Sequence, residues 1–385
     1  MDIKSTEQCV EELVDSDCIK MGKYKLKNGE TSKYYYNIKN IISNPKLVKK
    51  IGDNIYNMLG EFDIICGIPY GGLPIALYIS ITYNKPLIYI RDKAKSYGTG
   101  NLIEGTYKNS DRCVLIDDVI TSGKSMQETI NILQDKVNIV DIAVVIDRQQ
   151  NYECTMPIKS LIYKNDIVKY YLKKYTTEKK TRVCFSADIE NPYKLLEILN
   201  IVGKHIVICK IHYDIINLED YTRNFIDDLI ECSIRHKFLI MEDRKFVDIS
   251  YIVNKQYAKF KNWVDLVTVH NSVTYEVISK LSGILLVANM SNNVYDLTDR
   301  CVKMAKNNLN NIVGFITQYR IKHKDLPSDI VCMTPGVSNT NSKVADQKYK
   351  TVNEIDTDYI IAGRAIYNSD DIENSIKQLK NKIKK

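Results

Sequence analysis

The first half of the chain alternates short apolar runs with segments of helical spacing. Four runs rich in Ile and Val, each bounded by turn residues or charges, are predicted to be strands, at 63–69, 86–90, 113–119 and 141–148. Strands that are apolar almost throughout are typical of a parallel sheet buried on both faces. The segment 125–133 has the spacing of an amphipathic helix. We therefore expect an α/β fold with a Rossmann-like parallel sheet in this half.

The second half shows a longer alternation of the same kind. Strand candidates lie at 182–188, 205–211, 237–242, 265–270, 283–289, 311–317, 329–333 and 358–362. Most gaps between them can hold a helix, for example 191–201 and 299–307. Eight strand–helix units within about 200 residues predict a (β/α)8 TIM barrel, whose active site lies at the carboxyl ends of the strands.

The two halves are joined by a polar, lysine-rich stretch at 164–180. Such a run is most simply a solvated helix end followed by a linker. The length of 385 residues also suits two domains. We place the boundary between a first domain at 1–175 and a second at 176–385.

Composition narrows the class of protein and its partners. Hydrophobic residues make up 44% and charged residues 26%, which excludes a largely disordered chain. The net charge of +7 is small for this length, so it favours anionic metabolites over nucleic acid as partners. The uncharged stretch 64–84 is long enough to cross a membrane, but its glycines and prolines favour a strand, a loop and a helix start. We expect no membrane partner.

The cysteines indicate the compartment. The chain has ten cysteines, and no two of them form a CxxC motif. Half of them lie inside apolar, strand-like runs. Buried free thiols behave as small hydrophobic side chains, so we expect no disulfide framework and no zinc ribbon. The first residues of the chain include several acids, so we do not expect them to form a signal peptide. A reducing, cytoplasmic location is the expectation.

The first group of residues with candidate chemistry spans 114–125. An apolar strand ends in Asp117 and Asp118, and a short hydroxyl- and glycine-containing turn, 121–125, then opens a helix. Amide groups at a helix start form a cradle for phosphate. The carboxylates beside it can hold ribose hydroxyls or a magnesium-bound water. The order of acids, hydroxyls and glycine is the one that a phosphoribosyl pocket needs.

This segment resembles the 5-phosphoribosyl-1-pyrophosphate (PRPP) motif of type I phosphoribosyltransferases. Residues 18–172 resemble the orotate phosphoribosyltransferase family through four further segments, 26–37, 67–72, 91–98 and 147–149. The resemblance implies that orotate is bound by Lys27, Tyr35, Tyr36 and Arg148. It implies that PRPP is bound by Arg91, Lys93, Tyr97, Asp117, Asp118, Thr121, Ser122, Gly123, Lys124 and Ser125. It also implies a catalytic Lys95 and Mg²⁺ that arrives with PRPP near the paired acids.

One position departs from this family. A lysine usually follows Arg91, but Asp92 stands there, and Lys93 occupies a position where an acid is common. Loss of a cation beside pyrophosphate should weaken departure of the leaving group. A shift of one residue on a flexible loop could also be absorbed, so both outcomes remain open.

The second group of residues lies where the third barrel strand ends. Alternate residues of a strand share a face, so Asp243 and Lys245 should point into one cavity. The preceding strand supplies Lys210, followed by His212, for which we expect a supporting rather than a catalytic role. A surface salt-bridge ladder would explain the Asp-x-Lys pattern alone, but acids and lysines at neighbouring strand ends favour an active site.

These residues resemble the orotidine 5′-phosphate decarboxylase family over 181–385. The resemblance implies a catalytic array of Lys210, Asp243, Lys245 and Asp248, with the last acid reaching across a dimer interface. It implies that nucleotide is bound by Ser186, Asp188, Asn292, Pro335, Gln347, Tyr349, Gly363 and Arg364, and that no cofactor takes part. This chain has Ile252 where the family usually has Thr, and the helix that normally precedes the barrel is expected to be nearly absent because the linker is short.

Taken together, the halves predict two consecutive reactions and a homodimer or larger assembly. Orotate and PRPP would give orotidine 5′-phosphate, and loss of CO₂ would then give UMP. Three alternatives stay open: a transferase half degraded at Asp92, a related Mg²⁺-dependent barrel decarboxylase of sugar phosphates, and a non-catalytic nucleotide-binding protein. Gln347 and Tyr349 argue against the second, because a sugar phosphate does not require them. The Asp243–Lys245 arrangement argues against the third, because binding alone does not need it.

Overall fold

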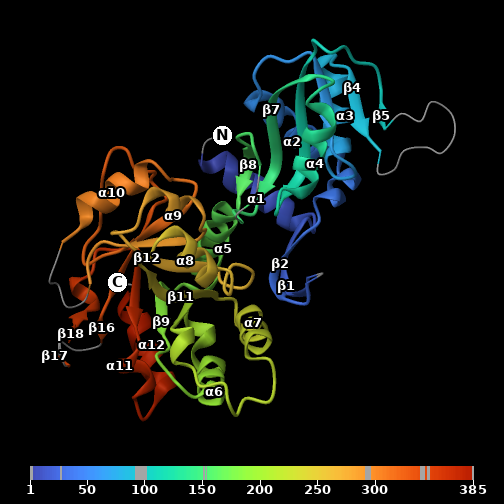
Figure 1. Cartoon of the computed structure of the whole chain (residues 1–385). Helices are drawn as coiled ribbons and strands as arrows, with labels where there is room; N and C mark the ends of the chain where they lie inside the picture. Colours follow the sequence, from blue (N-terminus) through green and yellow to red (C-terminus); the bar gives the residue numbers. More distant parts are fainter. Residues whose placement is uncertain are drawn as a thin grey trace. The chain divides into compact units, whose positions relative to one another are not determined.

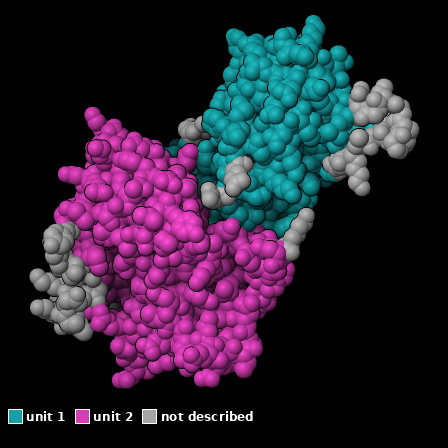
Figure 2. All heavy atoms as spheres, viewed as in Figure 1, with its two compact units in different colours: residues 1–20, 35–167 teal, residues 21–34, 168–385 magenta. Residues whose placement is uncertain are grey.

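The computed structural model, drawn as a cartoon in Figure 1, forms two compact units, which Figure 2 shows in different colours. It describes residues 3–26, 28–91, 102–150, 152, 154–290, 296–338, 343–344 and 347–383. The first unit comprises residues 1–20 and 35–167, and the second comprises residues 21–34 and 168–385.

The first unit is built on a six-stranded sheet in the order β5-β4-β3-β6-β7-β8. Its strands are β3 (Ile64–Gly67), β4 (Leu87–Ile90), β5 (Ile103–Glu104), β6 (Arg112–Ile120), β7 (Asn138–Asp147) and β8 (Lys159–Tyr163). All pairings are parallel except that of β4 with β5. The four strands predicted in this half are therefore confirmed, and β5 and β8 extend the sheet at its two edges.

Helices cover both faces of this sheet. They are α1 (Ile3–Asp15), α2 (Pro45–Met58), α3 (Gly72–Tyr83) and α4 (Lys124–Leu133). Met126, Ile130 and Leu133 of α4 pack on one face against Leu115 and other strand residues. Helices α2 and α3 pack on strands of the sheet as well as on each other. The uncharged stretch 64–84 is thus strand β3, a loop and helix α3, and within the described residues no helix is long and apolar enough to cross a membrane.

The second unit is a closed barrel of eight parallel strands in the order β10-β11-β12-β13-β14-β15-β20-β9. The strands are β9 (Val183–Ser186), β10 (Ile208–Ile211), β11 (Leu239–Phe246), β12 (Leu266–His270), β13 (Ile284–Val287), β14 (Ile312–Ile316), β15 (Val331–Pro335) and β20 (Tyr359–Ala362). All eight predicted strands are confirmed. Strand β11 continues past its predicted end at 242, and this carries Asp243 and Lys245 within the strand.

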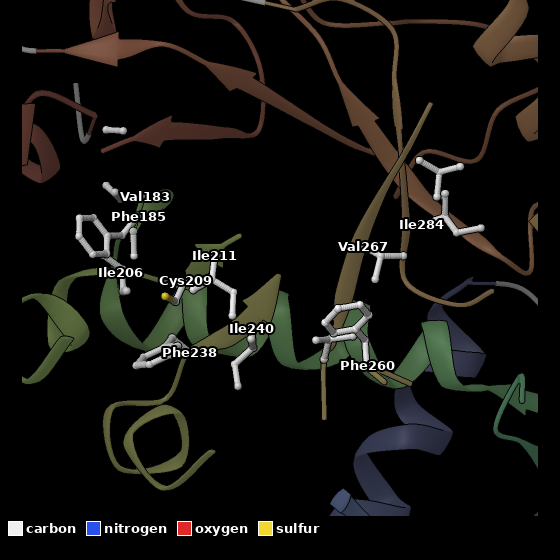
Figure 3. Packing of buried hydrophobic residues seen from close by; sticks show 14 of the residues in the cluster. Val183, Phe185, Ile206, Cys209, Ile211, Phe238, Ile240, Phe260, Val267 and Ile284 are labelled. Atoms are coloured by element: carbon white, nitrogen blue, oxygen red, sulfur yellow. The ribbon is translucent and has the colours of Figure 1, made fainter. Parts of the chain in front are cut away.

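Helices surround the barrel and cover its outer face. They are α6 (Pro192–Val202), α7 (Phe225–His236), α8 (Ser250–Tyr257), α9 (Tyr275–Ser279), α10 (Thr298–Lys306), α11 (Arg364–Tyr367) and α12 (Ile372–Ile383). Alternate strand residues such as Phe185, Cys209, Ile240 and Val267 join a buried hydrophobic cluster, part of which Figure 3 shows. The residues between them, such as Lys210, are left to face the barrel interior.

Two further features concern the helix before the barrel and a hairpin early in the sequence. Helix α5 runs unbroken over Lys164–Lys179, directly before β9, so the expectation that the helix preceding the barrel is nearly absent was wrong. The lysines that suggested a linker lie on this helix. The hairpin of β1 (Ile19–Lys25) and β2 (Thr31–Tyr36) belongs largely to the barrel unit, although it lies early in the sequence.

Candidate active sites

A pocket opens at the carboxyl ends of the barrel strands. Its lining consists of Ser186, Asp188, Lys210, Asp243, Lys245, Val287, Met290, Ile316, Pro335, Gly336, Tyr349, Ile361, Gly363 and Arg364. Nine of the twelve residues predicted for this site line the pocket, and they come from strands β9, β10, β11, β15 and β20 and the loops after them. The predicted catalytic and nucleotide-binding residues are therefore brought together from six separate stretches of sequence.

Asp243 is the centre of a charged network in this pocket. Its carboxylate lies 2.7 Å from Lys210 Nζ and 2.9 Å from Lys245 Nζ. Lys210 Nζ also lies 3.5 Å from Asp188 Oδ1 and 3.0 Å from His212 Nε2. Because both lysines reach one carboxylate, their two ammonium groups are held side by side at the pocket wall.

A local irregularity of β11 places Lys245. The register of β11 against β12 shifts between Glu242 and Phe246, and Lys245 takes a left-handed backbone conformation with φ of 48°. The Lys245 N–H donates to Thr268 Oγ1 at 2.9 Å, and that hydroxyl donates to Asp243 Oδ1 at 2.7 Å. A left-handed conformation costs a non-glycine residue about 1–2 kcal/mol, so this hydrogen-bonded chain stabilises a strained but useful geometry.

Charge pairing keeps these groups ionised although they are buried. Burial acts to raise the pKa of Asp243, but Lys210, His212 and Lys245 outweigh it and hold that pKa well below its usual value. Burial acts in the opposite direction on Lys210, and there Asp243 and Asp188 raise the pKa to about 12. Lys210 is therefore an ammonium group and Asp243 a carboxylate at neutral pH.

The rest of the pocket lining includes a cationic side chain, Arg364, and four apolar side chains. Arg364 follows β20, and its guanidinium lies 5.7 Å from the ring centre of Tyr349. The apolar lining comes from Val287, Met290, Ile316 and Ile361. These four were not predicted, since one apolar residue in a strand looks like any other, and only their place at the strand ends distinguishes them.

Three predicted residues of this site are not among those lining the pocket. Asp248 is exposed, and among the residues that the structure describes its hydrogen bond is a local one, accepted from the Ile249 N–H at 2.7 Å. Asn292 lies outside the described residues, as does the side chain of Gln347. Within one chain, the array therefore contains Lys210, Asp243 and Lys245 but not Asp248.

The predicted phosphoribosyl segment 117–125 lies in the first unit, on a strand, the turn after it and the start of a helix. Asp117 and Asp118 lie on β6, and the turn after this strand leads to Gly123, which caps α4 with φ of 73°. Among the described residues no side chain caps the start of α4, and the amide groups of a helix start suit an anion. A Cβ built on Gly71 would lie 2.0 Å from the Asp118 carboxylate, so the predicted pyrophosphate-side loop passes directly against these acids.

The orotate side of this site is described in part. The Arg148 guanidinium follows β7 and lies 5.1 Å from the ring centre of Tyr36, whereas Tyr35 is exposed. Arg91 forms a 3.0 Å ion pair with Glu104. Lys27, Asp92, Lys93, Lys95 and Tyr97 lie outside the described residues.

The carboxyl groups of Asp117 and Asp118 lie side by side, and a cation would stabilise both of them in the ionised form. Burial raises the pKa of Asp117 well above its usual value, and the neighbouring Asp118 raises it further. Carboxylate oxygens of this kind suit a hard cation such as Mg²⁺. Among the described residues, no group of three or more His, Cys, Asp or Glu side chains could hold a metal ion.

Comparisons with known proteins agree with this geometry. The orotidine 5′-phosphate decarboxylase / HUMPS family matches residues 181–379, and the phosphoribosyl transferase domain matches residues 37–168. An orotate phosphoribosyltransferase of Pyrococcus abyssi is 42% identical over 149 residues, covering 37% of this chain and 82% of that protein. An orotidine 5′-phosphate decarboxylase of Candida dubliniensis is 32% identical over 214 residues, covering 49% of this chain and 79% of that protein.

The similarity also extends over both halves at once. A uridine 5′-monophosphate synthase of Bos taurus is 29% identical over 444 aligned residues, covering 92% of this chain and 92% of that protein. A parallel barrel with a lysine–aspartate array, preceded by a phosphoribosyltransferase sheet, defines a two-domain enzyme. The chain belongs to the orotidine 5′-phosphate decarboxylase / HUMPS family in its second half and to the orotate phosphoribosyltransferases in its first.

Proposed function

We propose that this chain makes UMP in two consecutive reactions, with the activity that the bovine relative's name describes. The first unit joins orotate to the ribose of PRPP and releases pyrophosphate, and the barrel removes CO₂ from the resulting orotidine 5′-phosphate. The observation that carries the proposal is the Lys210–Asp243–Lys245 network in a pocket that Arg364 also lines. The product of one proposed site is the substrate of the other, which favours the pair over either activity alone.

The barrel pocket suits decarboxylation without a cofactor. When the bond from the pyrimidine ring to the carboxylate breaks, its electron pair stays on the ring carbon. We assign Lys245 to stabilise that carbanion and then donate the proton that replaces CO₂. Asp243 holds the two ammonium groups in place, while Arg364 binds the phosphate, whose binding energy can be used at the reacting carbon. The apolar wall would exclude water from the ring.

The first unit suits transfer of a phosphoribosyl group. The start of α4 and the turn at 121–125 bind the ribose phosphate, and Asp117 and Asp118 hold the ribose hydroxyls. Arg148 can clamp the planar carboxylate of orotate in two parallel hydrogen bonds, beside the Tyr36 ring. Mg²⁺, held by PRPP and the paired acids, would neutralise the pyrophosphate as it leaves. Arg91, Lys93, Lys95 and Tyr97 are assigned to the pyrophosphate side.

A second copy of the chain is part of this proposal. Asp248 is exposed rather than in its own pocket, and its neighbours Val247, Ile249 and Tyr251 are large apolar side chains that are also exposed. Exposed apolar clusters of this kind mark interaction surfaces. We propose that a homodimer covers this surface and brings Asp248 to the pocket of the other subunit.

The proposal is tested by following both reactions separately in the full-length chain. Orotate and PRPP should release pyrophosphate only when Mg²⁺ is present, whereas CO₂ release from orotidine 5′-phosphate should be unaffected by a chelator. Lys245→Ala should lower decarboxylase kcat by more than about a thousandfold, because both carbanion stabilisation and the proton are lost. Orotidine 5′-phosphate should then accumulate at the undiminished transferase rate.

Two outcomes would contradict specific parts of this proposal. UMP formation at the normal rate by the Lys245→Ala variant would exclude the assigned role of Lys245. Normal CO₂ release without any pyrophosphate release would mean that only the barrel is active, as expected if Asp92 has disabled the catalytic loop.

A further inference from the structure

Hydrogen bonds connect two segments of the barrel pocket that lie far apart in the sequence. The ring-side segment, residues 287–290, contributes two apolar side chains to the pocket lining. The phosphate-side segment, residues 349–350, contributes Tyr349, whose ring centre lies 5.7 Å from the guanidinium of Arg364. Both segments are hydrogen-bonded to residues 317–318, which directly follow β14 in the same unit.

The contact with the ring-side segment is buried. Asn289 Oδ1 accepts from Thr317 Oγ1 at 2.8 Å and from the Gln318 N–H at 3.3 Å. The backbone supports this contact, because the N–H groups of Ala288 and Asn289 donate to the Ile316 carbonyl at 2.9 and 3.2 Å. Asn289 is 2% exposed and Thr317 is 0% exposed. Removing one partner of a buried hydrogen bond leaves the other unsatisfied, so this contact is costly to lose.

The contact with the phosphate-side segment is made by a lysine. Lys350 Nζ donates to the Gln318 carbonyl at 3.0 Å, and the Lys350 N–H donates to the Gly336 carbonyl at 2.9 Å. Gln318 Nε2 donates to the carbonyl of Pro335 at 3.4 Å, and both Pro335 and Gly336 line the pocket. Gln318 therefore donates its N–H to Asn289 of one segment and accepts at its carbonyl from Lys350 of the other.

The proposed decarboxylation needs these two segments to keep a fixed spacing. Binding energy from the phosphate of the nucleotide accelerates the reaction only if the pyrimidine ring is held in its reacting position at the same time. A displacement of about 1 Å, caused far from the reacting bond, can lower the rate about a hundredfold. Side chains that hold the two segments together can therefore affect the rate without touching the substrate.

We propose that Thr317 and Lys350 are positioning residues for decarboxylation, since through Gln318 they hold the ring-side and phosphate-side segments at a fixed spacing. This inference rests on the decarboxylase function proposed above. Among the described residues that line the pocket, neither Thr317 nor Lys350 is included. Their effect therefore requires a substrate that engages both segments. Orotidine 5′-phosphate does so, whereas orotidine lacks the phosphate.

The test uses Thr317→Val and Lys350→Met in the full-length chain, with CO₂ release from both substrates measured on the same preparation. We expect kcat/KM for orotidine 5′-phosphate to fall about fivefold or more in each variant. The rate with orotidine, followed at high enzyme concentration, should stay within about twofold of that of the unsubstituted chain. Thr317→Ser, which keeps the hydroxyl, should restore the value for orotidine 5′-phosphate. Lys322→Met, at an exposed position on the loop after β14, is the matched control for Lys350→Met and should change neither rate.

The double variant tests whether the two residues act through one connection. If they do, removing the second contact adds little once the first is gone, so the loss in the Thr317→Val/Lys350→Met chain should be close to the larger of the two single losses. Losses that multiply would show that the two residues act independently, and the proposed connection through Gln318 would be overturned.

The outcomes are distinguishable from failure of the proposed function. If the unsubstituted chain releases no CO₂ from orotidine 5′-phosphate, the function itself is wrong. If it does so and both folded variants keep their kcat/KM, or lose activity equally with both substrates, the positioning role alone is overturned. If Thr317→Val does not fold, Lys350→Met decides, and a ratio of the two substrate rates equal to that of Lys322→Met overturns the proposal.

Discussion

At the scale of single residues, Thr268 connects the backbone of Lys245 with the carboxylate of Asp243, the two residues that we assign to decarboxylation. Its hydroxyl accepts from the Lys245 N–H and donates to Asp243, and the residue is buried. Thr268→Val keeps the shape but removes both hydrogen bonds. Hydrogen bonds to charged groups contribute about 1.5–3 kcal/mol, so decarboxylase kcat/KM should fall roughly 10- to 100-fold. Thr268→Ser, which retains the hydroxyl, is the control, and equal losses in both variants would contradict this role.

Glu242 is a buried carboxyl group that the proposed reaction does not use. Its Oε2 accepts the Tyr213 N–H at 3.0 Å, while Oε1 has no partner among the described residues. Burial raises its pKa from 4.5 to about 8. When folding raises the pKa of a carboxyl group, the folded state is most stable at low pH, where the group is protonated. The free energy of unfolding then falls as the pH rises from the pKa of the unfolded state through the pKa of the folded state.

Glu242→Gln should therefore remove a pH dependence of stability. The substitution resembles the protonated carboxyl, so Tm should be nearly unchanged at pH 5 and higher than that of the unsubstituted chain at pH 8.5. Each pH unit in this range changes the free energy of unfolding by at most about 1.4 kcal/mol. Thermal unfolding of the two chains over this pH range checks the expectation, and a Tm difference that stays constant with pH would exclude it.

At the scale of elements, Lys179 joins the end of α5 to the amino-terminal face of the barrel. Its ammonium donates to the carbonyls of Gly203 at 2.7 Å, His236 at 2.8 Å and Lys237 at 3.0 Å, and also to that of Ile206. These carbonyls lie at or just after the ends of α6 and α7, where a positive charge is favoured by the helix dipoles. One lysine thus satisfies backbone groups from two helices.

Lys179→Met should destabilise the barrel unit strongly without changing its chemistry. Loss of several buried hydrogen bonds from one amino group should cost about 2–4 kcal/mol, which corresponds to a Tm lower by roughly 5–15 °C. The midpoint is measured as decarboxylase activity remaining after heating. Lys194→Met, at an exposed position of α6, serves as the control and should leave the midpoint unchanged. A Lys179→Met midpoint equal to that of the control would contradict the role of Lys179.

The sequence predicted best those elements in which apolar residues follow one another without interruption. Apolar runs such as 113–119 and 141–148 identified buried strands, because two-sided burial leaves little choice of residue type. The shift in β11 that places Lys245 was not predictable, since it depends on Thr268 in the next strand. The prediction that α5 is partly a linker was wrong. A lysine-rich segment looks solvated in the sequence, and only the fold shows that Lys179 of this helix donates to a barrel carbonyl.

At the scale of the whole molecule, the sequence order of the two halves does not match the two compact units. Residues 21–34 precede nearly all of the first unit but belong to the barrel. Their key residue, Lys33, looks in the sequence like an ordinary surface lysine, since nothing nearby indicates that Asp265 is its partner 232 positions later. The proposed boundary at 175/176 would therefore separate the barrel from a buried part of its own unit, which local patterns could not predict.

The proposed dimer makes a prediction that no single-chain site could satisfy. If each pocket combines Lys245 of one subunit with Asp248 of the other, Lys245→Ala and Asp248→Asn damage different halves of a shared site. A mixed dimer then contains one pocket with both substitutions and one pocket with neither. Random re-association of equal amounts should restore decarboxylase activity to about a quarter of the unsubstituted value, because half of the dimers are mixed and each has one intact pocket.

The measurement requires both variant chains to be purified, mixed, dissociated under mild conditions and allowed to re-associate before assay. Each variant treated alone is the control, and a mixture that has not been dissociated should stay nearly inactive. A re-associated mixture with only the sum of the two separate activities would show that Asp248 does not act across subunits. In that case its exposed position beside Val247, Ile249 and Tyr251 would need another explanation.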